Sequence, residues 1–156
     1  MEAPMSIIIT NQYLTSICEL LASLPLAGAA SRARSKVLAM TTLAAQSLAE
    51  SELELAREHA LCDTTGTPQV DGDGHIRFDT PEQAAAFIQA RGVLLAERAE
   101  LSGPSYTTMA RTLYEALTTL TQPFAGDEAA AYDHLCDALE AHLATIKSEQ
   151  EVTGDE

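Results

Sequence analysis

The chain has 156 residues, of which 9 are Lys or Arg and 23 are Asp or Glu, and its formal net charge at pH 7 is −14. With 46% hydrophobic and 21% charged residues, the composition is that of a globular domain, which argues against wholesale disorder, collagen and coiled-coil fibres. The excess of acid also argues against direct binding to nucleic acid or to anionic membranes, because both require basic side chains.

The cysteines and the N-terminal segment indicate a cytoplasmic protein. Residues 1–10 hold one short apolar run, Ile7–Ile9, with no basic region before it, which is unlike a signal peptide. No apolar run approaches the roughly 20 residues of a membrane-spanning helix. The three cysteines are odd in number and widely spaced, which suits core thiols in a reducing compartment better than a disulfide framework. They are Cys18, Cys62 and Cys136.

The first part of the chain predicts a strand, a short helix and a long helix. The β-branched run predicts a strand over 6–10. Apolar residues at three- and four-residue steps predict a helix over 12–24, which Pro25 ends. Good helix formers without Gly or Pro then predict one long helix from about 28 to 61, which the breakers at 63–68 end.

The second part predicts a hairpin followed by three helices. Asp-Gly dipeptides predict a β-hairpin over 69–78, which would make the flanking helices antiparallel partners. Thr80, Pro81 and Gln83 form a capping box that begins a helix ending near 96 or 98. The expected elements beyond it are a short strand at 99–101, helices over 105–120 and 127–147, and an acidic flexible tail over 148–156. The apolar stripe expected on the last helix consists of Tyr132, Leu135, Cys136, Leu139, Leu143 and Ile146.

Together these elements predict a single, mostly helical domain over residues 1–147. Its class is mainly α (α+β), with about five helices, a small β-hairpin between the second and third helices, and a short N-terminal strand. Only 4% of the residues are aromatic and Trp is absent, so the core is expected to consist of Leu, Ile, Val and Ala. No internal repeat is expected.

One acidic segment resembles a calcium-binding loop but is better explained as a turn. Its carboxylates fall at positions 1, 3, 9 and 12 of an EF-hand frame. However, Ile76 stands where the frame needs glycine, and His75 is a poor ligand for a hard cation. A hairpin turn accounts for both glycines of the segment. The carboxylates concerned are Asp71, Asp73, Asp79 and Glu82.

Two His/Cys pairs could supply zinc ligands, namely His59 with Cys62 and His134 with Cys136. Residues two apart on a helix point about 200° apart, so the second pair is poorly arranged, and Cys136 continues an apolar stripe. No third group identifies a Cys-His hydrolase, and neither a phosphate-binding loop nor a serine elbow is present. We therefore expect no enzyme activity, no metal and no cofactor. A zinc- or thiol-dependent enzyme built on these four residues is the least favoured alternative.

Basic residues gather at the start of the long helix, where the macrodipole disfavours cations. Intramolecular pairing with acidic residues, such as those of the last helix, would compensate for this placement. A partner or phosphate site is the functional alternative. The residues are Arg32, Arg34 and Lys36.

An acidic stripe follows on the same helix, with carboxylates four residues apart. Each like-charge pair at this spacing costs ~0.2–0.5 kcal/mol. The stripe is either a solvated face or a surface that docks a basic partner or mimics DNA. Its residues are Glu50, Glu54 and Glu58, which complete the candidate binding set.

Two motifs give the chain a resemblance to a small-protein family. Residues 24–36, Leu-Pro-Leu-Ala-Gly-Ala-Ala-Ser-Arg-Ala-Arg-Ser-Lys, are similar to that family's small-residue turn followed by Ser-Arg-x-Arg-Thr-Lys. Residues 124–136 are similar to its Tyr-Asp-x-Leu-Cys ending, and the likeness spans about 10–140. The family occurs in phages and prophages of Gram-positive bacteria and is catalogued only as a domain of unknown function. The resemblance implies no activity and no binding residue.

We therefore expect a non-enzymatic phage accessory or late-region protein that acts through contacts with a phage or host protein, for example in virion assembly. Its expected location is the host cytoplasm or the virion. The alternative is an acidic, host-directed inhibitor that mimics nucleic acid and occupies a basic channel. Neither nucleic acid nor membrane is an expected direct partner.

Overall fold

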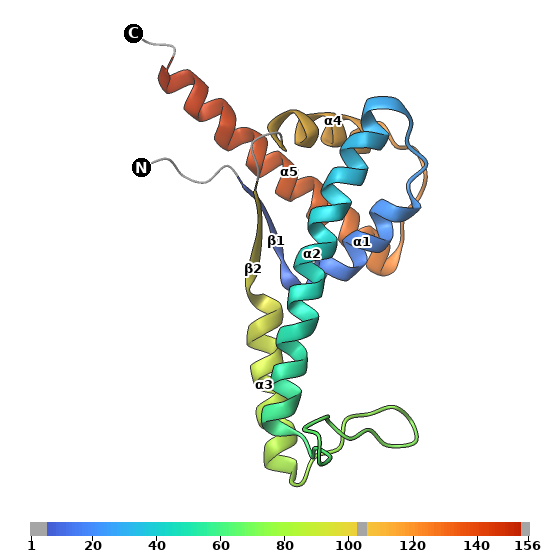
Figure 1. Cartoon of the computed structure of the whole chain (residues 1–156). Helices are drawn as coiled ribbons and strands as arrows, with labels where there is room; N and C mark the ends of the chain where they lie inside the picture. Colours follow the sequence, from blue (N-terminus) through green and yellow to red (C-terminus); the bar gives the residue numbers. More distant parts are fainter. Residues whose placement is uncertain (1–5, 103–105, 154–156) are drawn as a thin grey trace. The chain divides into compact units, whose positions relative to one another are not determined.

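The computed structural model describes residues 6–102 and 106–153 (Figure 1). The described part is mainly helical with a small β component, which confirms the predicted fold class. In chain order its elements are β1 (Ser6–Thr10), the 3-10 helix η1 (Asn11–Tyr13), α1 (Leu14–Ser23), α2 (Gly28–His59), α3 (Pro81–Ala96), β2 (Arg98–Ser102), α4 (Tyr106–Thr118) and α5 (Gly126–Thr153).

The chain divides into two compact units. One comprises residues 1–45 and 98–156 and is called the terminal unit; the other, residues 46–97, is called the hairpin unit. The last helix continues to Thr153, beyond its predicted end at Lys147. The single domain and the flexible tail stay predictions.

In the terminal unit, β1 pairs with a strand that lies far away in the sequence. It runs antiparallel to β2, and Ile7 is opposite Leu101. Ile7 and Ile9 are fully buried, whereas Ile8 between them is 41% exposed, as the alternation of side chains along a strand requires. The two predicted strands are therefore confirmed, and they form one sheet.

Aliphatic side chains of β1, α1, α4, α5 and the first half of α2, where Val37 is fully buried, form the core of the terminal unit. Helix α5 packs against β1, α1 and α4. The buried stripe of α5 is rotated from the predicted one, since Ala131 and His142 are buried while Tyr132 and Cys136 are half-buried. The largest fully buried residues of the three helices are Leu14, Ile17, Leu20 and Leu21 of α1, Leu113 and Leu117 of α4, and Leu135 and Leu139 of α5.

Two histidines of α5 hold the two ends of β1. Nδ1 of His142 lies 3.1 Å from the carbonyl oxygen of Ser6. The backbone N–H of Thr10 donates to Nε2 of His134 over 3.1 Å, and the His134 ring stacks on Tyr13 at a centroid distance of 4.3 Å. The eight residues from His134 to His142 rise about 12 Å along the helix, and the four steps from Ser6 to Thr10 span about 13 Å along the strand. The spacing of the two histidines therefore matches the length of β1.

In the hairpin unit, the second half of α2 and α3 run antiparallel, side by side (Figure 1). Nε of Arg91 donates to Oε2 of Glu52 across the helix pair over 3.0 Å. Helix α3 begins as predicted, because Oγ1 of Thr80 accepts the N–H of Gln83 over 3.2 Å. The antiparallel pairing of these two helices is confirmed.

The loop between α2 and α3 contains an eight-residue repeat, which corrects the expectation that no repeat is present. Three residues eight apart form a ring of backbone hydrogen bonds. The N–H of Leu61 donates to the carbonyl of Arg77 over 2.9 Å, and the N–H of Gln69 donates to the carbonyl of Leu61 over 2.8 Å. The N–H of Arg77 donates to the carbonyl of Gln69 over 2.9 Å. Backbone hydrogen bonds stabilise the ring, and they require little identity between the repeats.

The two repeats, residues 62–69 and 70–77, make the same turn. Oδ1 of Asp63 accepts the N–H groups two and four residues later, and Asp71 does the same. Gly66 and Gly74 occupy the matching position with φ of 82° and 83°, where only glycine is free of strain. The predicted hairpin is present as an antiparallel bridge between Val70 and Ile76, and the preceding turn has an equivalent bridge between Cys62 and Pro68.

Candidate interaction surface

The hairpin unit carries a wide apolar groove on one side of its helix pair. The groove has a volume of about 730 Å³. The Phe78 and Phe87 rings lie in its lining, 5.4 Å apart between centroids. The Glu52–Arg91 ion pair also borders it. We call it the apolar groove; the aliphatic residues that line it are Leu53, Ala56, Val70, Ile76 and Ile88.

Helix α3 has no buried residue at all, although it is rich in Ala, Ile, Leu and Val. Ile88 is 69% exposed in the apolar groove, and Val93 is 61% exposed on the opposite side of the helix pair. Within residues 46–97, only Leu48 and Ala56 are buried hydrophobic residues. This unit therefore leaves four large aliphatic side chains well exposed to solvent, namely Leu53, Val70, Ile88 and Val93.

A second groove, of about 230 Å³, lies on the Val93 side and is bordered by carboxylates. Glu54 and Glu58 line it from α2, and Glu97 lines it beyond the end of α3. No basic side chain is among its lining residues. We call it the acidic groove; its remaining lining residues are Ser51, Leu55, Ala90, Val93 and Leu94.

The structure separates the members of the predicted acidic stripe. Glu54 and Glu58 line the acidic groove, whereas Glu50 is exposed on the preceding turn of α2 and does not line it. Glu97, which lines the same groove, was not a candidate, because only the tertiary structure brings it next to α2. The acidic groove is thus assembled from two segments of the chain.

The predicted basic segment lies in the terminal unit, where Arg34 has an intramolecular role. Its Nη1 donates to the carbonyl oxygen of Leu24, at the C-terminal end of α1, and its Nη2 donates to Oγ of Ser31 over 2.9 Å. A guanidinium there interacts favourably with the α1 dipole. Arg32 and Lys36 are exposed, and none of the three pairs with a described acidic residue, so the expected ion pairs are not formed.

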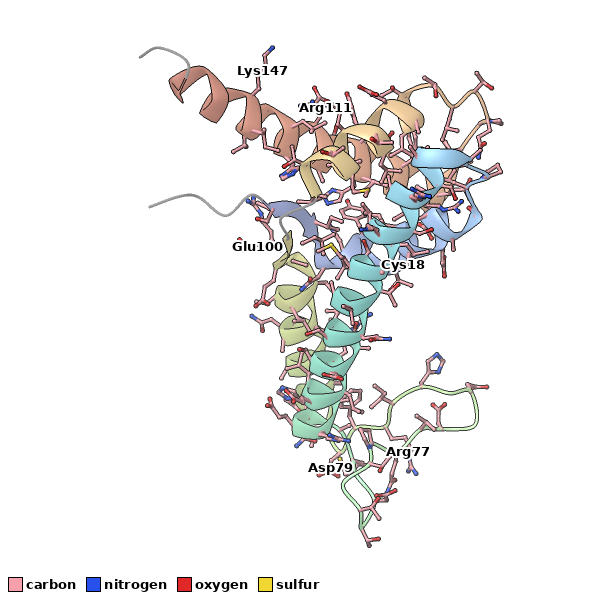
Figure 2. All side chains as sticks on the ribbon, turned by 45° about the horizontal axis from the view of Figure 1, so that its top comes forward. Cys18, Arg77, Asp79, Glu100, Arg111 and Lys147 are labelled. Carbon is pink, nitrogen blue, oxygen red and sulfur yellow. The ribbon has the colours of Figure 1, made fainter. Side chains whose placement is uncertain are left out.

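In the segment that resembles a calcium-binding loop, the Asp71 carboxylate closes a turn. Asp71, Asp73 and His75 are the only group of three potential ligands found close together among the described residues. All three are exposed, and the Asp71 carboxylate already accepts two backbone N–H groups, which lower its pKa. Figure 2 shows Arg77 and Asp79 farther along the same loop. Loop closure therefore accounts for this segment.

The surroundings of Cys18, Cys136 and His134 favour structural roles for these three side chains. Burial raises the pKa of the Cys18 and Cys136 thiols, which favours the unreactive thiol form. Nε2 of His134 already accepts the N–H of Thr10, so it is not a free ligand for zinc.

The apolar residues of the two grooves escaped sequence reasoning, although α3 carries a signal for them. Its apolar residues occur on all sides rather than along one stripe, as in a helix that packs against more than one neighbour. The segment 84–96 therefore has more apolar surface than α2 alone can bury, which is a signal for a second neighbour.

No protein-family model, curated protein or solved structure matches this chain. Among the described residues, no helix combines the length and the apolar character that crossing a membrane requires.

Proposed function

We propose that this protein is a non-enzymatic phage accessory or late-region protein that acts through protein–protein contacts, such as those of virion assembly. The observation that carries the proposal is the complete absence of buried residues from α3. Burial of apolar surface stabilises a complex by about 25 cal/mol per Å², so packing of a partner on this helix is favourable. The resemblance over residues 10–140 supports the assignment to phages.

A protein fits this surface better than a small ligand does. Ile88 and Val93 lie in different grooves, on opposite sides of the helix pair, so one small molecule cannot cover both. Exposed apolar side chains gathered in a groove, as Leu53, Val70 and Ile88 are, mark sites of protein association. The partner is a phage or host protein, met in the host cytoplasm or the virion, with neither nucleic acid nor membrane bound directly.

Site-specific photocrosslinking in phage-infected cells tests the proposal. A photoreactive residue at position 88 or 93 should crosslink to a discrete partner, identified by mass spectrometry. Leu43 is 67% exposed but lies in the terminal unit, so a photoreactive residue there is the matched control. If positions 88 and 93 give no more crosslinked protein than position 43, the proposal is wrong.

The second candidate function is an acidic inhibitor directed at a host nucleic-acid enzyme. The acidic groove supports it, because Glu54, Glu58 and Glu97 border that groove without a basic neighbour in the lining. The same crosslinking separates the two functions. A capsid or tail protein as partner favours virion assembly, whereas a host nuclease or polymerase favours the inhibitor.

A further inference from the structure

We propose that the acidic groove binds a basic amphipathic helix of the partner protein. This inference rests on the proposed function, since it names the chemistry of one partner segment, and it concerns only one of the two grooves. The partner helix would place its apolar side chains on the floor of the groove and its Lys or Arg side chains against the rim.

The floor of the groove is apolar and open to solvent. Leu55 contributes from α2, and Ala90, Val93 and Leu94 contribute from α3. The α3 residues recur at three- and four-residue steps, which is the pattern that ridges of a packed helix present to a neighbour. Val93 remains 61% exposed, so there is room for a partner side chain beside it. The floor thus provides the surface that an amphipathic helix needs.

The rim selects the sign of the partner's charge. The hairpin unit contains ten acidic residues against three arginines, and one of those, Arg91, is already paired with Glu52 beside the other groove. Glu54 and Glu58 are one helical turn apart, about 6 Å along the axis. Basic residues four apart on a partner helix have the same spacing and can face both carboxylates.

Electrostatics favours this occupant over the competing ones. Symmetric pairing of two copies through this groove would bring another three carboxylates against Glu54, Glu58 and Glu97, and like charges at an interface are costly. A nucleic acid would be repelled for the same reason. A basic helix alone satisfies both the apolar floor and the acidic rim.

Fluorescence anisotropy with a designed peptide tests this inference on the full-length protein. The probe is a labelled 14-residue peptide of Leu and Lys, with Leu at helical i, i+3, i+4 and i+7 positions. We expect micromolar binding that weakens by about tenfold or more between 50 and 500 mM NaCl. Peptides with Glu in place of Lys, or with the Leu positions shuffled, should bind at least about tenfold more weakly.

Two matched variants locate the binding site. Val93→Lys places a positive charge on the floor of the acidic groove, whereas Ile88→Lys makes the same change in charge on the same helix but in the apolar groove. Both residues are exposed, so both variants should fold, which circular dichroism checks. Val93→Lys should weaken peptide binding about tenfold, and Ile88→Lys should change it less than about twofold. Glu54→Gln with Glu58→Gln should lower the salt dependence.

Equal losses in the two Lys variants, or no binding at about 100 μM peptide, would overturn the inference. So would a homodimer, measured by analytical ultracentrifugation, that Val93→Lys dissociates, because a second copy would then cover the groove. These failures leave the proposed function standing as long as position 88 or 93 still crosslinks to a partner. Loss of crosslinking at both positions would instead remove the basis of both proposals.

Discussion

Leu139 illustrates how a single residue supports the terminal unit. It is fully buried on α5, on the stripe that the three- and four-residue spacing predicted. Leu139→Ala would leave a cavity, and we expect it to lower the free energy of unfolding by ~2–5 kcal/mol, measured by urea denaturation. Leu43→Ala is the control, because Leu43 is 67% exposed and its truncation should stay within ~0.5 kcal/mol. A loss below ~1 kcal/mol at Leu139 would contradict the observed packing.

Other individual residues were harder to assign from the sequence. The helical pattern places Tyr132 and Cys136 on the buried stripe of α5, but both are half-buried, and His142 is 4% exposed instead. Hydropathy predicts an exposed position for a histidine rather than a buried one. The carbonyl of Ser6, 136 residues away, satisfies Nδ1 of His142 and makes its burial possible. No local pattern contains that information.

At the scale of elements, the two histidines of α5 make the attachment of β1 sensitive to pH. Nε2 of His134 accepts an N–H and must be unprotonated to do so, while Nε2 of His142 is buried without a hydrogen-bond partner among the described residues. Burial lowers the pKa of both groups; attraction by Asp137 partly opposes this for His134, as the Ser6 carbonyl does for His142. Protonation of His134 removes the acceptor for the Thr10 N–H, and protonation of His142 places a charge in a buried site, so both changes destabilise the packing of α5 on β1.

The direction of the effect on stability follows from linkage. Because both pKa values are lower in the folded state, the unfolded chain binds protons first, and stability falls as the pH drops below about 6.5 toward the folded pKa values. We expect the urea midpoint to fall between pH 7 and pH 5. His134→Gln with His142→Asn replaces the bonded nitrogens by neutral amide atoms and should flatten this part of the profile. A flat wild-type profile would contradict the prediction.

The element boundaries were largely predictable, because local chemistry sets them. Pro25 ends the first helix within one residue of the expected place, and the Thr80 cap begins α3 as predicted. The repeat in the 61–77 loop was missed, since its ring of backbone hydrogen bonds needs only Asp and Gly at matching positions. So few identical residues give a weak signal in a single sequence.

At the scale of the whole molecule, the net charge of −14 opposes the compact state by self-repulsion. Salt screens this repulsion, so we expect the melting temperature at pH 7 to rise by roughly 2–4 °C between 50 and 500 mM NaCl, as for a stabilisation of ~1 kcal/mol. At pH 5, nearer the pI of about 4.5, the rise should be smaller. A melting temperature that falls with salt at pH 7 would show that attractive ion pairs outweigh the repulsion.

Helix periodicity, caps and breakers predicted the mainly α class and the positions of the elements. They also predicted the antiparallel pairing across the 61–77 loop. All of these properties depend on residues close together in the chain. The pairing of β1 with β2, the placement of Glu97 beside Glu54 and Glu58, and the exposure of both sides of α3 required the three-dimensional arrangement. Burial and groove formation depend on which distant segments meet. A helix with apolar residues on all sides predicts that neighbours exist, but only packing shows which side they leave open.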